Sequence, residues 1–550
     1  TLDWTGTEYR RPAAYDLRCY LPGSGIRVDG GAGGMVLTNT FAVDAEVTVD
    51  GSLTVAPGGR IVQTAGANTG TQDSDRGYRM VVAVTGGMTV ESNAVIDAAG
   101  KGFSYSGSGG SGPGRPTTAN RGGTHGGMAA DSAGACYGSL TAPTAYGSGG
   151  STAYSAGGGA IRLTVAGTLA VDGLVDADGK GGQAYPGAGG SIWIAAGALA
   201  GSGTIRANGG YTTGTYPGGG GRVAVAVTNE DALVSAFGGT ISAYGGVAGS
   251  SGTQPLSAAG TLYLRDGGEG ETEGTLLVDN GGATAAGGAA EIAGGVTDAD
   301  VGNVVVTNGS ALNIRAGQTL TVRRNWVNAG CLVTGELGSG DVAHGTVAFA
   351  DTNFVSRISG TNSFAGFTCA TPGKTLEFGT GGSHLIIPAG GLLTLAGAEG
   401  NLVTLRPGVP GVHWTMACFG GTDISHVDVG WSDAQAGNTV IVTAPETCVH
   451  TETVNWGFVT VTPGETLTWT GEADTDWANP ANWVTAALVH RPPAATDDVY
   501  IPSVASGRYP LLGAGQTLNQ LRIDPSASLD LNHFSIAVTN NLRVAGTLTA

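Results

Sequence analysis

The chain has 550 residues, of which 100 are glycine and 12% are charged, and its formal net charge is −18. Glycine is more than twice as frequent as in an average protein, and charged residues are about half as frequent. The negative charge argues against nucleic acid or an anionic membrane surface as partners. No apolar run reaches the length needed for a membrane-spanning helix, so no membrane span is expected in this segment.

Short apolar segments separated by glycine corners begin at residues 45–49 and 52–55, and the pattern returns over residues 78–102. Apolar and polar residues alternate within these segments, which predicts short strands. A Gly-, Ser- and Thr-rich insertion follows at residues 103–155. This insertion is far longer than an ordinary loop. We expect it to form an ordered loop along one face of the stacked strands, where glycine allows close backbone approach.

Residues 156–246 repeat nearly the same sequence three times. Each copy opens with glycines and an alternating apolar strand, and closes with a second short strand followed by glycine. Ile161, Ile192 and Val223 occupy equivalent positions 31 residues apart. A fixed period near thirty residues predicts a stacked repeat protein, in which each coil contacts its neighbours.

From residue 275 the glycine content falls and short strands follow one another to about residue 458. A further section begins with Thr466–Gly471, which resembles Thr1–Gly6. It also contains Trp477 and Trp483 in a loop-like segment. The pattern predicts three parts: residues 1–280, a Gly-rich β-helix carrying the loop insertion 103–155; residues 281–460, regular β-helix coils; and residues 461–550, the start of a further Trp-containing β-helical module.

The predicted fold is all-β, a right-handed, three-faced parallel β-helix (a solenoid) with almost no helix. Three short strands per coil of about thirty residues match this geometry, with each strand about 4.8 Å from its equivalent in the next coil. Small apolar side chains suit a narrow interior, and Gly or Asn suits the corners. A twisted array of β-sandwiches is the structural alternative, and the steady period argues against it.

Three stretches carry a resemblance to known proteins: the Gly-rich block at 122–163, the strand series at 400–458, and the Trp-containing module at 469–502. Together they resemble large, secreted, repetitive bacterial surface proteins with autotransporter- or adhesin-like β-helical passengers. The resemblance implies an extracellular, cell-surface location and a structural or adhesive role. The chain has no signal peptide and no initial Met, so we expect a processed protein or a segment of a longer one.

The function expected from the sequence is that of an extracellular structural protein, a β-helical building unit of a bacterial cell-surface filament, sheath or stalk. It would assemble end to end with other copies of itself, or form part of a giant chain. A glycan-binding adhesin is the alternative, and a polysaccharide lyase or hydrolase is a less favoured one. No catalytic residues are predicted and the chain is not expected to be an enzyme, because most of its acids lie at turns beside Gly or Ala.

Calcium is the one cofactor considered, because pairs of carboxylates two residues apart occur as they do in calcium loops. The candidate ligands are Asp73, Asp75, Asp176, Asp178, Asp298 and Asp300. Solvated turns are the alternative interpretation of these pairs. Surface glycans are a candidate partner, and the candidate glycan-binding residues are Trp477, Trp483, His125 and Tyr137. Core packing of the tryptophans and a structural role for the histidine are the alternatives.

The six cysteines are widely spaced and form no metal-binding or redox motif. They are Cys19, Cys136, Cys331, Cys369, Cys418 and Cys448. A few disulfides in an exported protein and buried free thiols within a β core both fit this spacing, and no pairing is predicted.

Overall fold

The computed structural model of the chain describes residues 2–4, 26–28, 35–37, 46–63, 79–105, 109–117, 119–130, 134–153, 155–182, 184–249, 257–284, 288–336, 344–379, 384–442, 444–458, 464–486 and 489–550. Asp73, Asp75 and Cys19 lie outside the described residues.

The described residues contain many short strands and no α-helix. The helical segments in them are three single turns of 3₁₀-helix: η2 (Val234–Ala236), η3 (Pro445–Thr447) and η4 (Pro480–Asn482). The prediction of an all-β chain with almost no helix is confirmed. The described strand pairings are parallel, apart from the antiparallel pairs β16–β17 and β39–β40.

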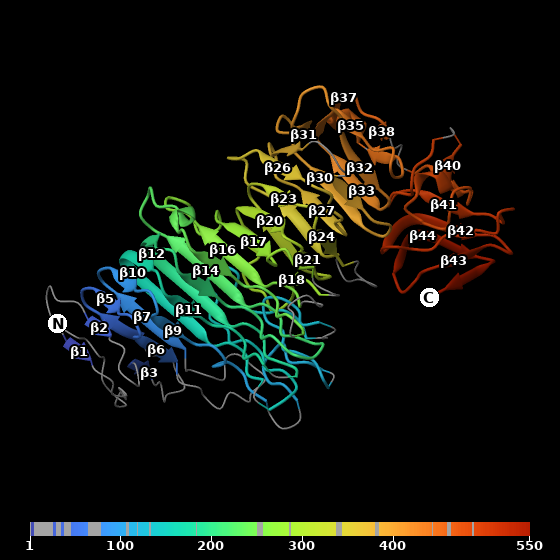
Figure 1. Ribbon diagram of the computed structural model, residues 1–550. Helices are drawn as coiled ribbons and strands as arrows, with labels where there is room; N and C mark the ends of the chain where they lie inside the picture. Colours follow the sequence, from blue (N-terminus) through green and yellow to red (C-terminus); the bar gives the residue numbers. More distant parts are fainter. Residues whose placement is uncertain are drawn as a thin grey trace. The chain divides into compact units, whose positions relative to one another are not determined.

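The chain divides into two compact units, Thr1–Leu312 and Asn313–Ala550 (Figure 1). The predicted boundary near residue 280 therefore falls inside the first unit. One sheet of this unit contains β1 (Leu2–Trp4), β2 (Ile26–Val28), β4 (Glu46–Val49), β5 (Leu53–Val55), β7 (Met80–Val84), β8 (Met88–Val90), β10 (Ala160–Val171), β12 (Ser191–Ala200), β14 (Arg222–Val227), β16 (Thr261–Arg265), β17 (Thr275–Asp279) and β20 (Asn303–Thr307).

A second sheet of the first unit contains β3 (Met35–Leu37), β6 (Arg60–Gln63), β9 (Val95–Asp97), β11 (Leu174–Asp176), β13 (Thr204–Arg206) and β15 (Thr240–Ser242). The short strands β18 (Ala290–Ile292) and β19 (Asp300–Val301) follow, and β21 (Ala311–Ile314) crosses the boundary between the units.

Strand register in the first unit follows the sequence repeat. Ile161 of β10 is the partner of Ile192 in β12, which is the partner of Val223 in β14, and Val223 is the partner of Leu262 in β16. In the second sheet Val175 has one partner in β9 and one in β13. The positions that the 31-residue period marks as equivalent are therefore neighbours in space.

The core of the first unit is one continuous cluster of buried apolar side chains from both sheets. Alternate residues of each strand point into it, as in Ala160–Val171, where the buried positions alternate with partly exposed ones. Core members from the first sheet include Val82, Leu163, Ile194 and Val225, and members from the second include Ile96, Val175 and Ile205. Most inward positions are filled by Val, Ile, Leu and Ala, as the sequence predicts, and Met80, Met88 and Phe237 fill others.

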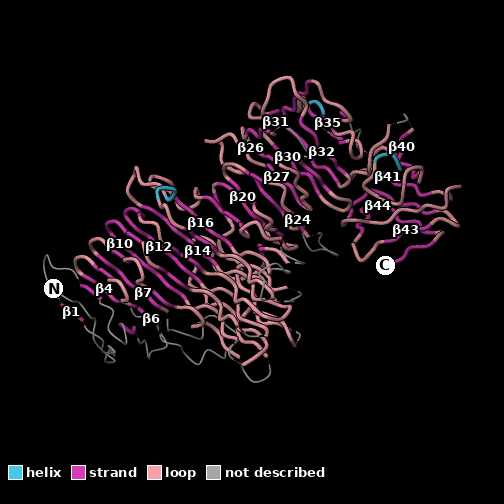
Figure 2. Tube along the Cα trace, viewed as in Figure 1, coloured by secondary structure: helices cyan, strands magenta, loops and turns pink. Residues whose placement is uncertain are grey.

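A glycine-rich layer lies beside the two sheets, and Figure 2 shows it as loop segments gathered along one side of the strands. Its segments are not strands, yet they exchange backbone hydrogen bonds: Gly147 N donates to Gly158 O (2.9 Å) and Gly158 N donates to Ala188 O (2.8 Å). A Cβ atom built on Gly158 would lie 1.9 Å from Ala177 O. Only glycine permits this approach. We call this the glycine layer; it comprises residues 122–127, 147–150, 156–159, 187–190, 218–221 and 258–260.

The second unit continues the series of short parallel strands. Its strands up to residue 458 are β22 (Thr319–Val322), β23 (Trp326–Asn328), β24 (Leu332–Gly335), β25 (Thr346–Phe349), β26 (Ser356–Ser359), β27 (Gly366–Cys369), β28 (Thr375–Phe378), β29 (Leu385–Ile387), β30 (Leu392–Ala396), β31 (Val403–Pro407), β32 (Trp414–Cys418), β33 (Gly421–Ser425), β34 (Val427–Gly430), β35 (Ser432–Asp433), β36 (Val440–Val442), β37 (Val449–Thr451) and β38 (Trp456–Phe458).

The last part of the second unit has a hydrophobic cluster of its own, built from residues between Leu467 and Phe534. Its strands are β39 (Thr466–Trp469), β40 (Trp483–Thr485), β41 (Asp498–Ile501), β42 (Gln516–Ile523), β43 (Ser528–Asp530), β44 (Ile536–Val544) and β45 (Thr547–Thr549). We refer to residues 464–550 as the C-terminal module.

Candidate functional site

The paired carboxylates Asp176 and Asp178 lie at the end of β11, beside Arg206 of β13. Arg206 Nη2 is 2.7 Å from Asp176 Oδ2, and its Nε is 3.0 Å from Asp178 Oδ2. Burial and the neighbouring Asp176 carboxylate raise the pKa of Asp178 to about 7, and together they outweigh the attraction of Arg206. Backbone N–H groups of Asp178 and Asn208 also donate to this pair. The two acids therefore belong to an ion-pair ladder across the sheet.

Asp298, another calcium candidate, accepts hydrogen bonds from the insertion. Ser139 Oγ and Leu140 N each donate at 2.6 Å, and Thr141 donates from its N at 2.9 Å and from its Oγ1 at 2.5 Å. Burial alone would raise the pKa of Asp298, but these hydrogen bonds together lower it. Asp298 therefore holds the insertion in place, while Asp300 lies in β19. Within the described residues no group of three or more His, Cys, Asp or Glu side chains is arranged to hold a metal ion.

His125 and Tyr137, both proposed as glycan contacts, lie in the interior. His125 is fully buried in the glycine layer, with Nδ1 2.8 Å from Gly189 O and its ring 4.7 Å from the Tyr137 ring. Burial, aided by the charge of Arg222, lowers the pKa of His125 to about 3. The Tyr137 hydroxyl donates to Tyr146 O at 2.5 Å. The structural role that the sequence left open for the histidine matches this position, and neither ring faces solvent.

Arg222 completes the same buried cluster, and sequence reasoning missed it. Its side chain is fully buried, and it donates from Nε to Tyr137 O (2.7 Å) and from Nη1 to Thr261 Oγ1 (2.8 Å). It thereby joins β14 to the insertion and to β16. A buried arginine at the start of a strand carries no distinctive sequence signal, since the same pattern is common at exposed strand ends.

Trp477 and Trp483 are also core residues. Their exposed fractions are 2% and 0%, and their rings pack edge to face at 4.7 Å, with Trp483 packed in the same way against Trp469 at 4.9 Å. Trp483 Nε1 donates to Trp477 O at 2.7 Å. No ring face is available for a sugar, so the glycan-platform interpretation is wrong for this pair and the packing alternative holds.

The five cysteines in the described residues are free thiols: Cys136, Cys331, Cys369, Cys418 and Cys448. Burial raises the pKa of Cys369 and of Cys418 to about 12. Thiols with such a pKa stay protonated at neutral pH and are poor nucleophiles. These two cysteines therefore act as small apolar core residues.

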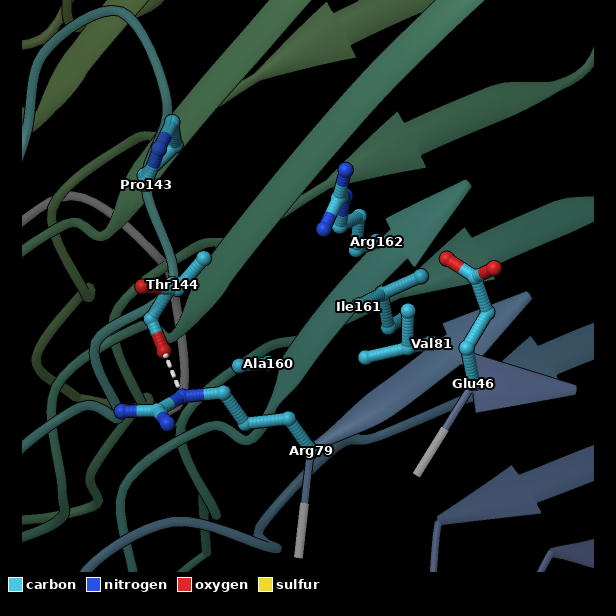
Figure 3. A pocket seen from close by; sticks show the side chains of 8 residues that line it. All are labelled: Glu46, Arg79, Val81, Pro143, Thr144, Ala160, Ile161 and Arg162. Atoms are coloured by element: carbon cyan, nitrogen blue, oxygen red, sulfur yellow. Dashed lines mark hydrogen bonds between the residues drawn. The ribbon is translucent and has the colours of Figure 1, made fainter. Parts of the chain in front are cut away.

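A pocket of about 150 Å³ lies on the outward side of β4, β7 and β10 (Figure 3). Strand register places Glu46, Val81, Arg162 and Trp193 beside one another on four adjacent strands. The Arg162 guanidinium lies 4.3 Å from the centre of the Trp193 ring. Its Nε atom is buried and has no hydrogen-bond partner. A polar atom of this kind marks a place where water or a ligand is expected.

One end of this pocket is formed by the insertion, through Pro143 and Thr144. Arg79 Nε donates to Thr144 O at 2.6 Å, which Figure 3 shows as a dashed line, and the Arg79 guanidinium lies 5.5 Å from the Tyr146 ring centre. The sequence did not reveal this pocket, because its residues come from four separate segments between Glu46 and Arg162. A register alignment of residues 78–84 with residues 159–165 would have brought Val81 and Arg162 together.

Comparison with known proteins adds no family to these observations: no protein-family model, no curated protein and no solved structure matches the chain. Among the residues that the structure describes, no helix combines the length and apolar character required to cross a membrane.

Proposed function

We propose that the chain is an extracellular structural protein, a right-handed parallel β-helix that serves as a building unit of a bacterial surface filament, sheath or stalk. The observation that carries this proposal is the register of β10, β12 and β14, in which equivalent residues of successive repeats are parallel partners. In the proposed solenoid, the two sheets and the glycine layer are the three faces of the coils that contain β10, β12 and β14. Such a solenoid grows by adding coils, which suits an extended scaffold.

The use of polar side chains supports a structural role over a catalytic one. Asp176 and Asp178 pair with Arg206, Asp298 holds the insertion, and His125 is buried with a pKa of about 3. A general base must reach substrate and titrate near the working pH. Burial keeps His125 neutral and away from solvent, so it fits a packing role.

The exposed edge of the C-terminal module supports assembly. β44 is the last strand of its sheet and pairs with β42, while β45 pairs with β43. Leu542, Val544 and Leu548 of these strands are 54%, 39% and 37% exposed. An exposed strand edge with apolar side chains is a template for further strand pairing. A further coil, from a second copy of the chain or from a longer polypeptide, would cover these residues.

The test is sedimentation of the purified chain over a range of concentrations, with electron microscopy of the same samples. The double variant Leu542→Lys and Leu548→Lys places charges on the edge, and Leu233→Lys, at a residue 51% exposed near η2, is the matched control. We expect wild type and control to form filaments and the edge variant to remain monomeric. Monomers at all concentrations, or filaments of the edge variant equal to wild type, would contradict end-to-end assembly.

Mass measurement of native material under denaturing conditions distinguishes the two forms of assembly. Filaments that dissociate into chains of about 54.3 kDa consist of separate subunits. A mass several times larger identifies a stalk within one giant polypeptide. Fibre diffraction with no 4.8 Å strand spacing along the long axis would contradict both forms, because a parallel β-helix stacks its strands along that axis.

A further inference from the structure

We propose that the pocket on the outward side of β4, β7 and β10 binds the carboxylate of a uronic acid residue in an acidic polysaccharide. This adds a ligand to the scaffold and does not depend on whether the chain assembles into filaments. The site consists of Arg162 supported by Trp193, of Glu46 across the pocket, and of Arg79 and Thr144 at the end closed by the insertion.

Arg162 is the anion-binding group. Its guanidinium lies over the Trp193 ring, 4.3 Å from the ring centre, and this cation–π contact supports the side chain beside the pocket. Its Nε is buried without a partner. A carboxylate in the pocket that Arg162 lines can accept hydrogen bonds from the guanidinium and supply its counter-charge.

Glu46 provides the hydrogen-bond acceptor at the other end of the pocket. Val81 of β7 lies between Glu46 and Arg162, because it pairs with Glu46 of β4 on one side and with Arg162 of β10 on the other. Two strand spacings place the Cα atoms of Glu46 and Arg162 about 10 Å apart. Figure 3 shows both side chains projecting to the same side of the sheet, with Val81 between them. A ligand bound here has a carboxylate at one end and hydrogen-bond donors, such as sugar hydroxyls, at the other.

The charge of Glu46 also selects against competing anions. A dicarboxylate would place its second negative charge near this side chain, where repulsion disfavours binding. A uronic acid has one carboxylate, and its ring hydroxyls can donate to Glu46. The volume of about 150 Å³ admits one sugar ring.

The surface beside the pocket favours a polysaccharide over a peptide carboxylate. Two residues further along the strands, Thr48, Ala83 and Thr164 are partners across the same three strands. The two threonines are partly exposed. They place hydroxyls on both sides of a short alanine, where the next sugar of a chain can exchange hydrogen bonds.

The experiment is isothermal titration calorimetry of the full chain with an oligosaccharide of galacturonic acid. Arg162→Gln removes the positive charge and leaves a shorter polar side chain. Arg357→Gln, at an arginine whose side chain is 77% exposed, is the matched control. We expect binding by wild type and control, and at least tenfold weaker binding by Arg162→Gln, as the loss of charged hydrogen bonds implies. Circular dichroism melting confirms that each variant is folded.

Three further ligands test the assignment. A neutral oligosaccharide of the same length should bind at least tenfold more weakly than the uronate, and succinate should not compete with the uronate in wild type. In Glu46→Gln the uronate should still bind, and succinate should begin to compete. Equal binding of neutral and acidic oligosaccharides, full uronate binding by Arg162→Gln, or no uronate binding by wild type would overturn the proposal. Binding of a peptide C-terminus that depends on Arg162, without uronate binding, would assign the pocket to peptides and overturn it as well.

Discussion

Replacement of Gly158 by alanine tests whether the glycine layer is a packed part of the fold. The new Cβ would lie 1.9 Å from Ala177 O and 2.4 Å from Gly190 N, and these two atoms are joined by a hydrogen bond of 2.8 Å. Neither can move without disturbing the layer. Overpacking of this kind costs about 1–3 kcal/mol. Movement of Gly158 also weakens its hydrogen bonds to Gly147 and Ala188, at about 1 kcal/mol each.

The reduced entropy of the unfolded alanine variant offsets about 0.4–1 kcal/mol of this cost. We therefore expect the free energy of unfolding to fall by about 3 kcal/mol, measured as a decrease of several degrees in the transition of the first unit by differential scanning calorimetry. Gly238→Ala is the control, because the closest atom to its Cβ would be Gly201 O at 3.5 Å and its backbone is not left-handed. We expect this control to unfold within about 1 kcal/mol of wild type. Equal transitions for the two variants would refute the packing argument.

Three further predictions concern buried charges. His125 has an ordinary pKa of 6.5 and a folded pKa of about 3, so the unfolded state binds more protons between these two pH values. The contribution of the neutral His125 ring to stability is therefore complete above pH 6.5. It is lost as pH falls towards 3, at about 1.4 kcal/mol per pH unit. Urea midpoints between pH 7 and 4 should fall less steeply for His125→Gln than for wild type, and parallel slopes would argue against the buried neutral ring. Asp178 gives the opposite dependence of stability on pH. Because its pKa rises from 3.8 to about 7 on folding, the folded state binds more protons, and stability falls as pH increases from about 4 to 7. Asp178→Asn should remove this trend from the same urea series. Lys374 donates from Nζ to three backbone carbonyls at 2.8–2.9 Å, and its pKa is lowered to about 8 by burial. Lys374→Met should lower the free energy of unfolding by about 3 kcal/mol in urea denaturation, because it leaves these carbonyls unpaired, and an unchanged midpoint would contradict this role.

The repeat was the most informative feature of the sequence. The equivalence of Ile161, Ile192 and Val223 predicted which residues become partners across strands, and the structure confirms it. Such a prediction succeeds because the strands of successive repeats pair with one another, so the period in the sequence is also the period in space. The alternation of apolar and polar residues likewise marked the core side of each strand.

The candidate site residues were harder to infer, because a residue type does not show its own burial. Asp298 fits a calcium loop in sequence, yet donors from the insertion more than 150 residues away surround it. Trp477 and Trp483 fit a sugar platform in sequence, yet they pack against each other, and Trp483 also packs against Trp469. In each case the deciding partner is distant in the chain.

The sequence by itself determined the all-β class, the near absence of helix, the length of the repeat and the inward positions of its strands, because these follow from local periodicity. The tertiary structure alone decided how the insertion packs into the glycine layer, which charges are buried, and that Glu46, Val81 and Arg162 line one pocket. The physical reason is that these features arise from contacts between segments joined by the strand register and by long loops, and neither leaves a periodic signal in the sequence of any one segment.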